Sequence, residues 1–293
     1  MRIVSLLPSA TELVCAAGGR DRLVGVSHEC DFPADVVGLP VLTRCRTSLG
    51  RGSEAIDRSI RASLETALSV YEVDADALAA VRPDVVVTQD LCDVCAVSYD
   101  DVCAAAKQLG NPDLRIVNLH PTRLGDIWED LRRVGEALGA DTTAVRAAMT
   151  ARVEAVRARA AGLPRRRVLT VEWLAPIMIG GTWMPEMVEI AGGEALVATA
   201  GAHAPTLTDD AYAALDPDVV LVKPCGYDLA HTRAEWDRVR ALAAMHPRAR
   251  VYVADGNAYF NRPGPRIVDS LEILAAAIHP EVFGADERLV AVL

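Results

Sequence analysis

Two cysteines separated by two residues, Cys92 and Cys95, form the pair whose spacing most directly suggests chemistry. Thiols at this spacing can bind one metal ion or form a redox-active dithiol. A structural zinc site needs two more ligands, and His28 and Cys30 could supply them. Three alternatives stay open: unmodified thiols, a zinc or iron site formed by Cys92, Cys95, Cys30 and His28, and a redox pair. His28 could also simply hydrogen-bond its own loop.

The aromatic residues are a second candidate group, because they make up only 4% of the chain. Trp173, Trp183, Tyr227, Tyr259 and Phe260 all fall in predicted loops of the C-terminal half. A large flat ligand needs rigid apolar walls with a few polar groups at its edge, and these side chains could supply them. The alternative is that Trp183 and Phe260 fill the core of their domain.

The segment NRPGPR contains two arginines, Arg262 and Arg266, in a stiff stretch of chain. Its prolines restrict the backbone, so both guanidinium groups could be held ready for an anionic group on a ligand or partner. The alternative is an ion-paired start of the following helix. The full set of candidate ligand-binding residues is Ser9, His28, Gln89, Cys92, Trp173, Trp183, Cys225, Tyr227, Tyr259, Asn261, Arg262 and Arg266.

The elements that must position these residues are short β-branched runs that alternate with helical patterns. The predicted strands are Ile3–Leu6, Leu23–Val26, Val85–Thr88, Ile116–Leu119, Val168–Glu172, Val219–Val222 and Val251–Ala254. Their alternation with helices predicts βαβ units on mainly parallel sheets. Ligands of such sheets bind beyond the carboxyl ends of the strands, and most of the candidate residues follow those ends.

An internal repeat organises the chain into two lobes. The segment TELVCAAGG from Thr11 resembles PEMVEIAGG from Pro185, and DADALAAVRPDVVVTQ from Asp74 resembles TDDAYAALDPDVVLVK from Thr208. The matched order places about 40 additional residues in the first copy, between Gly19 and Asp74.

A helical stretch separates the two copies. Residues 126–161 are rich in Ala, Arg, Leu and Glu and predict one long helix, with Gly139 as the place where it could break. We therefore predict an α/β fold of two βαβ lobes with mainly parallel sheets joined by a long α-helix. The N-terminal lobe is expected at residues 1–122, the connecting helix at 123–164 and the C-terminal lobe at 165–293, with a small-molecule ligand in the cleft between the lobes.

Composition and charge narrow the possible classes of protein. The chain is 51% hydrophobic and 24% charged, and a net charge of −10 without a basic run argues against nucleic acid as a partner. No segment approaches the roughly 18–20 apolar residues of a membrane span, so membrane insertion is not expected. The mature fold is expected to start at residue 2 without a signal peptide. This predicts a cytoplasmic protein, or an extracytoplasmic one only if the start site is misassigned.

Sequence motifs for phosphate binding and nucleophilic catalysis are missing from the chain. Neither GxxxxGK[ST], nor GxGxxG after a strand, nor GxSxG occurs. Their absence favours a binding protein over an enzyme. The alternative is a cytoplasmic metal-handling protein or enzyme that reuses the fold, with a Cys/His/Arg site in the cleft.

The segments RIVSLLPSATELVCAAGG and LAAVRPDVVVTQ resemble the class III periplasmic binding proteins, in particular their vitamin B12-binding members, over nearly the whole chain. The resemblance implies cobalamin, another corrinoid or an iron chelate as the ligand, and makes His28 a candidate axial ligand of a corrinoid cobalt. It also implies a membrane transporter as partner, docked through one acidic residue of each lobe. Those positions fall on Asp76 and Asp210. The expected lack of an export signal and the number of cysteines are the two departures that we predict from the family pattern.

Overall fold

Two sheets of mainly parallel strands organise the chain, whose computed structural model describes residues 1–46, 50–65, 70–91 and 97–292. The first of two units comprises Met1–Gly50, Arg58–Pro121 and Gly125–Ala147. The second comprises Arg51–Asp57, Thr122–Leu124 and Ala148–Leu293. Within the described residues, no helix combines the length and the apolar character needed to cross a bilayer.

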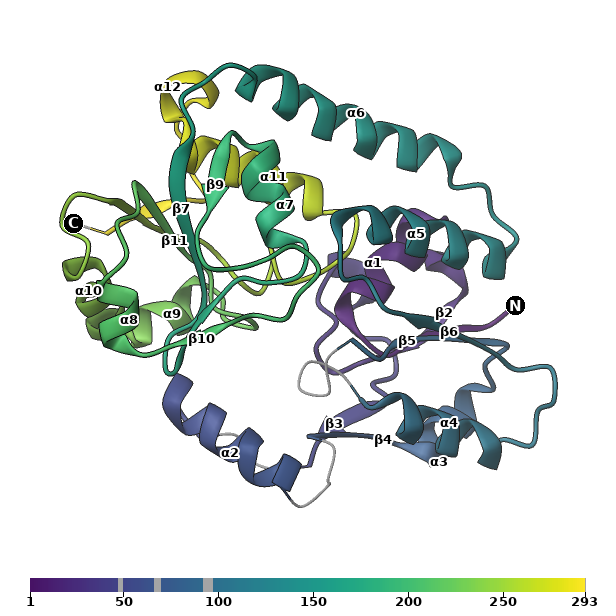
Figure 1. Ribbon diagram of the computed structural model, residues 1–293. Helices are drawn as coiled ribbons and strands as arrows, with labels where there is room; N and C mark the ends of the chain where they lie inside the picture. Colours follow the sequence, from purple (N-terminus) through teal and green to yellow (C-terminus); the bar gives the residue numbers. More distant parts are fainter. Residues whose placement is uncertain (47–49, 66–69, 92–96, 293) are drawn as a thin grey trace. The chain divides into compact units, whose positions relative to one another are not determined.

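The first unit is built on four parallel strands in the order β2-β1-β5-β6 (Figure 1). The strands are β1 (Ile3–Ser5), β2 (Leu23–Val26), β5 (Val85–Gln89) and β6 (Arg115–Leu119). Every residue of the central strand β5 is buried. A strand covered on both faces needs side chains that are apolar or otherwise satisfied in both directions, and this explains its run of three valines.

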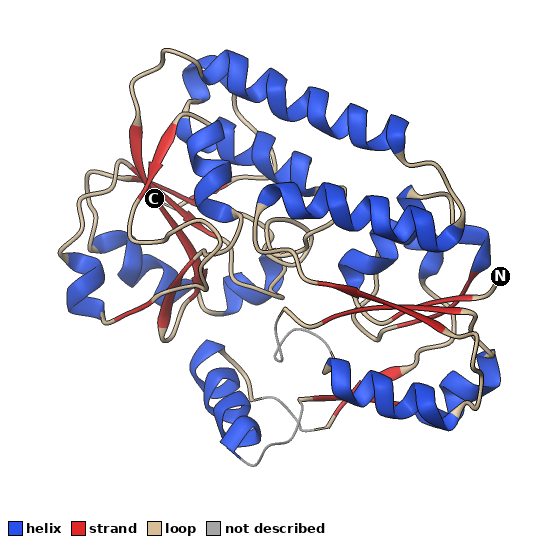
Figure 2. Cartoon of the chain, turned by 45° about the vertical axis from the view of Figure 1, so that its right-hand side comes forward, coloured by secondary structure: helices blue, strands red, loops and turns tan. Residues whose placement is uncertain are grey.

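Helices cover both faces of this first sheet. Helices α1 (Pro8–Ala16) and α5 (Leu124–Leu138) lie on one face, and α3 (Ala75–Val81) and α4 (Tyr99–Gln108) lie on the other (Figure 2). The additional residues of the first sequence copy form the antiparallel pair β3 (Thr43–Cys45) and β4 (Tyr71–Val73), helix α2 (Ser53–Glu65), and short 3-10 helices at Arg20–Arg22 and Ala34–Val36.

The second unit repeats the same arrangement of four parallel strands. Strand β9 pairs with β7, β7 with β11 and β11 with β12, which matches the order β2-β1-β5-β6 of the first unit. Antiparallel strands β8, β10 and β13 extend this sheet. The bounds are β7 (Arg166–Trp173), β8 (Ile177–Ile179), β9 (Gly193–Ala195), β10 (Thr206–Leu207), β11 (Val219–Val222), β12 (Arg250–Val253) and β13 (Val290–Ala291). This common topology agrees with the predicted repeat.

Helices also cover both faces of the second sheet. One face carries α7 (Met184–Ile190) and α11 (Ile267–Ile278), and the other carries α8 (Asp209–Ala213), α9 (Leu229–Ala234) and α10 (Trp236–Ala244) (Figure 1). The short helix α12 (Pro280–Phe283) follows α11. Alternate strand residues face opposite helices, so Leu169, Val220 and Val222 pack with Tyr212 and Leu242 on the side of α8 and α10.

The helical region predicted between the copies forms two helices, α5 and α6 (Thr143–Ala160). The break lies at Gly139, which has a positive φ of 66°. The backbone N–H of Ala140 donates to the carbonyl oxygen of Gly135, and that of Gly139 donates to Glu136. This is the Schellman ending of a helix, which favours glycine because its backbone is left-handed there. The expectation of a single continuous helix was therefore wrong, while the possible break at Gly139 is confirmed.

Candidate functional site

The carboxyl ends of β1 and β5 place two expected ligand-binding residues of the first unit. Ser9 is the second residue of α1, which starts three residues after the end of β1, and Gln89 is the last residue of β5. Their exposed fractions are only 3% and 6%. Both residues lie at the edge where parallel sheets bind ligands, although little of either side chain reaches the surface.

His28 follows β2 and uses both ring nitrogens within its own surroundings. Its Nδ1 lies 2.7 Å from Thr43 Oγ1, and its Nε2 lies 3.3 Å from Glu29 Oε1. The backbone N–H of His28 also donates to Thr43 Oγ1, at 3.1 Å. One ring nitrogen thus contacts β3 and the other contacts the neighbouring residue of the loop, so the surroundings of His28 resemble those of a structural histidine more than those of a free ligand.

The expected metal ligands are only partly described. Cys30 is buried, with its Sγ 3.0 Å from Thr11 Oγ1, and Thr11 donates to Ser5 Oγ at 2.8 Å. Cys92 and Cys95 lie outside the described residues, so the four-ligand site stays a prediction. Within the described part of the chain, no three His, Cys, Asp or Glu side chains come together as a metal site.

Two polar residues directly after β5 and β6 form a pair that the sequence did not single out. His120 Nδ1 lies 2.6 Å from Asp90 Oδ1, and Asn118 donates from Nδ2 to Asp90 Oδ2 at 2.7 Å. Burial alone would raise the pKa of Asp90, but the hydrogen bonds from Asn118 and His120 outweigh it and hold that pKa below its ordinary value. A carboxylate therefore orients the imidazole at this edge.

A buried ion pair lies at the matching edge of the second unit. Lys223 follows β11 and is completely buried, and its Nζ lies 3.1 Å from Glu172 Oε2 of β7 and 2.7 Å from Asn261 Oδ1. Asn261 also donates to the carbonyl oxygens of Lys223 and Gly256. A Cβ at Gly256 would lie 2.0 Å from the carbonyl oxygen of Pro224, so a glycine is needed for this close approach. Asn261, expected to bind ligand, thus holds Lys223.

The aromatic candidates divide into two groups. Trp173, the last residue of β7, is half-buried and packs edge-on against Tyr227, with ring centroids 5.2 Å apart. Trp183 and Phe260 are buried, and Trp183 Nε1 donates to the carbonyl oxygen of Phe260 at 2.8 Å. Trp183 and Phe260 therefore have the surroundings of core residues, whereas Trp173 and Tyr227 form a rigid aromatic pair at the carboxyl edge.

Tyr227 is held from a second side by Glu235. Burial first, and then the hydrogen bond to the Glu235 carboxylate, raises the pKa of Tyr227 above its ordinary value. Glu235 also accepts hydrogen bonds from the backbone N–H and the hydroxyl of Ser53, at 2.8 and 2.7 Å. Cys225, another candidate, is half-buried, and its backbone N–H donates to the carbonyl oxygen of Glu172. The aromatic pair is thus held by the packing of its two rings and by the hydrogen bond of Tyr227 to Glu235.

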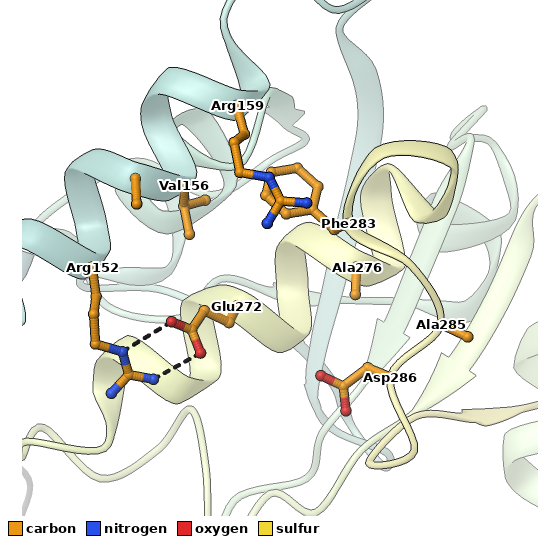
Figure 3. A pocket seen from close by; sticks show the side chains of 9 residues that line it. Arg152, Val156, Arg159, Glu272, Ala276, Phe283, Ala285 and Asp286 are labelled. Carbon is orange, nitrogen blue, oxygen red and sulfur yellow. Dashed lines mark hydrogen bonds and ion pairs between the residues drawn. The ribbon is translucent and has the colours of Figure 1, made fainter.

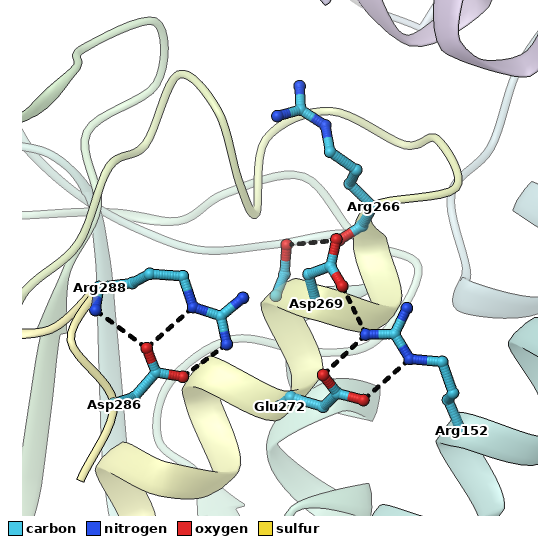
Figure 4. Close-up of polar contacts among 7 residues, drawn as sticks. Arg152, Arg266, Asp269, Glu272, Asp286 and Arg288 are labelled. Atoms are coloured by element: carbon cyan, nitrogen blue, oxygen red, sulfur yellow. Dashed lines mark hydrogen bonds and ion pairs between the residues drawn. The ribbon is translucent and has the colours of Figure 1, made fainter. Parts of the chain in front are cut away.

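The two arginines of the segment NRPGPR lie in different environments. Arg262 is buried and donates from Nη2 to Asn257 Oδ1 at 2.9 Å. Arg266 precedes α11 and is partly exposed, with its guanidinium 5.7 Å from the ring centroid of Tyr259. Figure 4 shows Arg266 directed away from the ion pairs of α11. Arg288 stands 5.6 Å from the same Tyr259 ring, so Tyr259 is shared by two guanidinium groups.

The two expected docking residues occupy equivalent positions. Asp76 is the second residue of α3, and Asp210 is the second residue of α8. Both carboxylates are exposed. Each helix is capped by the residue two positions earlier: Asp74 accepts from the N–H of Ala77, and Thr208 accepts from the N–H of Ala211.

A pocket of about 280 Å³ lies elsewhere in the second unit, between α6 and the α11–α12 region (Figure 3). It is lined by Arg152, Ala155, Val156, Arg159, Glu272, Ala276, Phe283, Ala285 and Asp286. Arg152 is ion-paired with Glu272, and Arg159 stacks on Phe283 at 4.3 Å (Figure 3, Figure 4). None of the candidate site residues lines it, and its charged groups already have partners.

Sequence reasoning did not select Asp90, His120, Glu172 and Lys223 as site residues. The available signal was their position, because each ends or directly follows a β-branched run. Pairs such as Asp90 with His120 follow from strand register: Gln89 is opposite Leu119, so the next residues are neighbours too.

Comparison with known proteins gives a consistent result for sequence and structure. Residues 3–246 match the family model described as periplasmic binding protein. The vitamin B12-binding protein of Yersinia pestis is 25% identical over 271 residues, which cover 91% of this chain and 82% of that protein. The ABC transporter substrate-binding lipoprotein YvrC of Bacillus subtilis is 23% identical over 293 residues, covering 96% of this chain and 81% of that protein.

Solved structures share the fold. The periplasmic vitamin B12 binding protein of Vibrio cholerae has a TM-score of 0.68 and 20% identity, with 94% of this chain and 96% of that chain covered. A periplasmic heme binding protein from Pseudomonas aeruginosa has a TM-score of 0.70 and 22% identity, with 100% and 98% covered. The predicted fold class, the α/β class III periplasmic binding protein fold with mainly parallel sheets, is confirmed.

Proposed function

Because the chain belongs to the periplasmic binding protein family, we propose that it binds a corrinoid, such as cobalamin, or a related metal chelate and presents it to an ABC transporter. The observation that carries the ligand class is the fixed aromatic pair Trp173 and Tyr227 at the carboxyl edge of the second sheet. A rigid aromatic surface beside a few polar groups suits a large, flat, mostly apolar ligand.

The polar groups near the aromatic pair support the same ligand class. Glu172 is the neighbour of Trp173 in the chain, and a quarter of its side chain is exposed. The buried ammonium group of Lys223 neutralises the charge of the Glu172 carboxylate. Arg266 and Tyr259 add a cation and a hydroxyl in the same unit. Such groups can bind the polar substituents at the edge of a ring ligand while the aromatic faces cover its plane.

Names of relatives also support the proposal. The Yersinia protein is named as vitamin B12-binding, and the Pseudomonas structure is titled as heme binding. Both named ligands are metal ions held in a large macrocycle. The two acidic positions Asp76 and Asp210 support a transporter as partner, because both are exposed on the first turn of equivalent helices.

A binding experiment tests the proposal. Purified protein is titrated with cyanocobalamin and with haemin, and binding is followed by absorbance and by calorimetry. We expect one chelate bound per chain, and binding about tenfold weaker in Trp173→Ala. The matched control is Trp128→Ala, because Trp128 lies in α5 and donates to the carbonyl oxygen of Arg146. Equal losses in both variants would contradict the assigned surface.

The alternative of a metal-handling protein or enzyme gives a different result in the same preparation. It predicts a colourless protein that contains zinc or iron, that loses the metal in Cys92→Ser with Cys95→Ser, and that binds neither chelate. The cytoplasmic location predicted from the N-terminal sequence is tested separately, by fractionating cells that express the gene with its own upstream region.

A further inference from the structure

Exposed apolar side chains gather in one segment of the first unit. Among the described residues, five large apolar side chains are exposed, and three of them, Phe32, Val37 and Val41, lie in the segment 32–41. Their exposed fractions are 42%, 68% and 54%, and we call these three residues the apolar patch. Single exposed apolar residues are ordinary, but several in one surface segment are typical of a site that contacts another molecule.

The backbone around the apolar patch is anchored to the first unit at two points. The short 3-10 helix Ala34–Val36 lies in the middle of the segment, and Val36 is completely buried. At the end of the segment, Leu42 is also completely buried, and its backbone N–H donates to a carbonyl oxygen of strand β2 at 2.8 Å. Val37 and Val41 lie between these two anchors in the chain, so their exposed side chains are carried by a supported backbone.

The end of the segment adjoins the helix that carries Asp76. Strands β3 and β4, which follow the segment and precede α3, pair antiparallel (Figure 1). Directly beyond their last pair, the backbone N–H of Asp74 donates to the carbonyl oxygen of Leu42 at 2.9 Å. Val41 therefore lies next to the start of α3, whose second residue is the exposed Asp76. The apolar patch and this carboxylate are neighbours on the surface of the same unit.

The second unit has an exposed apolar residue in the corresponding segment. Strand β9 occupies the place of β2, α8 occupies the place of α3, and Val197 lies between β9 and α8 with 43% of its surface exposed. Val197 has a φ of 72°, and the backbone N–H of Ala198 donates to the carbonyl oxygen of Leu196 across it. This γ-turn is unfavourable for a β-branched residue. Each unit thus exposes apolar surface in the segment that leads to the helix of its docking carboxylate.

Resting on the proposed function, we infer that the apolar patch and Asp76 together form the surface with which the first unit docks onto the transporter. The carboxylates of Asp31 and Asp35 are exposed in the same segment, and Arg20 pairs with Asp35. The partner surface therefore has apolar side chains at its centre and arginine or lysine residues beside them. A second copy of this chain fits less well, because it would bring the same carboxylates against each other.

The two parts of this surface affect different rate constants. Exposed charges speed association and are screened by salt, whereas buried apolar contacts slow dissociation and depend little on salt. Asp76→Lys is therefore expected to lower the association rate, most strongly at low salt. Val37→Thr with Val41→Thr is expected to raise the dissociation rate. Threonine keeps the β-branched shape of valine, so the backbone of the segment should be retained.

The test measures binding of the full chain to the cognate transporter in lipid nanodiscs by surface plasmon resonance. The chain is used with cyanocobalamin or haemin bound and also without ligand, at about 50 and about 500 mM salt. We expect Val37→Thr with Val41→Thr to dissociate about tenfold faster at both salt concentrations, with an unchanged Kd for the chelate. Val37→Ile with Val41→Ile should dissociate as slowly as wild type. The control is Ala158→Ser with Ala161→Ser, which adds two hydroxyls at exposed positions of the second unit.

Each result distinguishes the inference from the function on which it rests. A wild-type dissociation rate in the threonine variant overturns the inference, and so does an equal increase in the alanine-to-serine control. If the threonine variant weakens chelate binding by the same factor, the apolar patch belongs to the ligand site instead. Loss of transporter binding in Asp76→Lys with Asp210→Lys alone leaves the proposed function intact. If wild type does not bind the transporter in any preparation, the proposed transporter partner and this inference both fail.

Discussion

Lys223 Nζ lies 3.1 Å from Glu172 Oε2, and the lysine is completely buried whereas the glutamate is 25% exposed. The charge of Lys223 is thus removed from water and balanced by one carboxylate and the Asn261 amide. The pair sits at the junction of β7 and β11, where the backbone N–H of Lys223 donates to Val171. The ion pair therefore helps to hold the edge of the sheet that carries Trp173.

Breaking this pair at the glutamate is expected to destabilise the fold strongly. Glu172→Gln leaves the ammonium of Lys223 buried without its counter-ion, which we expect to cost roughly 2–4 kcal/mol in the free energy of unfolding. Urea denaturation followed by fluorescence measures it. The control is Arg152→Ala, which breaks exposed ion pairs with Asp269 and Glu272 (Figure 4) and should cost less than about 1 kcal/mol. Similar losses in the free energy of unfolding for both variants would show that burial of the Lys223 charge does not make this pair more important than an exposed one.

His246 is expected to make the protein acid-sensitive. Burial lowers its pKa, against a smaller opposite effect of Asp216, and its ring packs edge-on against Tyr212 with centroids 4.6 Å apart. The folded state therefore binds fewer protons than the unfolded state, so stability is lost as the pH falls through the ordinary histidine value near 6.5. His246→Phe should reduce the drop in melting temperature between pH 7 and pH 5 by a few degrees.

The control for His246 is His203→Phe, because His203 is exposed. It should leave the drop in melting temperature as large as in wild type. If His246→Phe also loses stability as steeply as wild type, another group is responsible for the acid sensitivity.

Asp130 has the opposite pH dependence. Burial raises its pKa to about 6, although Arg133 lies 3.2 Å away and lowers it. Because the folded pKa lies above the ordinary value of 3.8, stability falls as the pH rises through this interval. Asp130→Asn is expected to raise the free energy of unfolding by about 1–3 kcal/mol at pH 8, with a gain that shrinks toward pH 4.

Chemical denaturation at several pH values checks the Asp130 prediction. Glu136→Gln is the matched control, because it removes an exposed carboxylate from the same helix α5. Its effect should stay within about 0.5 kcal/mol across the range. A gain for Asp130→Asn that does not change with pH would show that charge is not the cause.

If Asp76 and Asp210 dock onto the transporter, reversing their charges should reduce stimulation of the transporter without changing ligand binding. Asp76→Lys and Asp210→Lys reverse an exposed charge on the first turn of α3 or α8, and should reduce stimulation of the cognate transporter's ATPase at least about tenfold in the double variant. The Kd for the chelate should stay unchanged. Asp113→Lys with Glu287→Lys is the charge-matched control at other exposed positions, and an equal effect there would indicate general electrostatics.

The sequence alone was sufficient to predict those strands that consist of a continuous apolar, β-branched run. Val219–Val222 was predicted with its observed bounds, because a strand buried on both faces needs a continuous apolar run. Short edge strands such as β10, with only Thr206 and Leu207, carry no such pattern. Gly139 marked the helix break, but the pattern on either side continued as helix, so the choice between one and two helices depended on local hydrogen bonds.

The site was less predictable because its key relations are between strands. Composition identified Trp173 and Trp183 equally, yet one lies at the surface edge and the other donates to Phe260 in the core. Asp90 and His120 are thirty positions apart, and only the register of β5 with β6 makes them neighbours. No single segment of sequence contains that information.

The equivalent helices α3 and α8 are capped by different types of residue. Asp74 in one copy and Thr208 in the other accept from the third backbone N–H of equivalent helices. Two different side chains thus meet the same backbone requirement at the start of a helix. The two units keep the same strand order while their strand ends differ, with Asp90 and His120 in one unit and Trp173 and Tyr227 in the other.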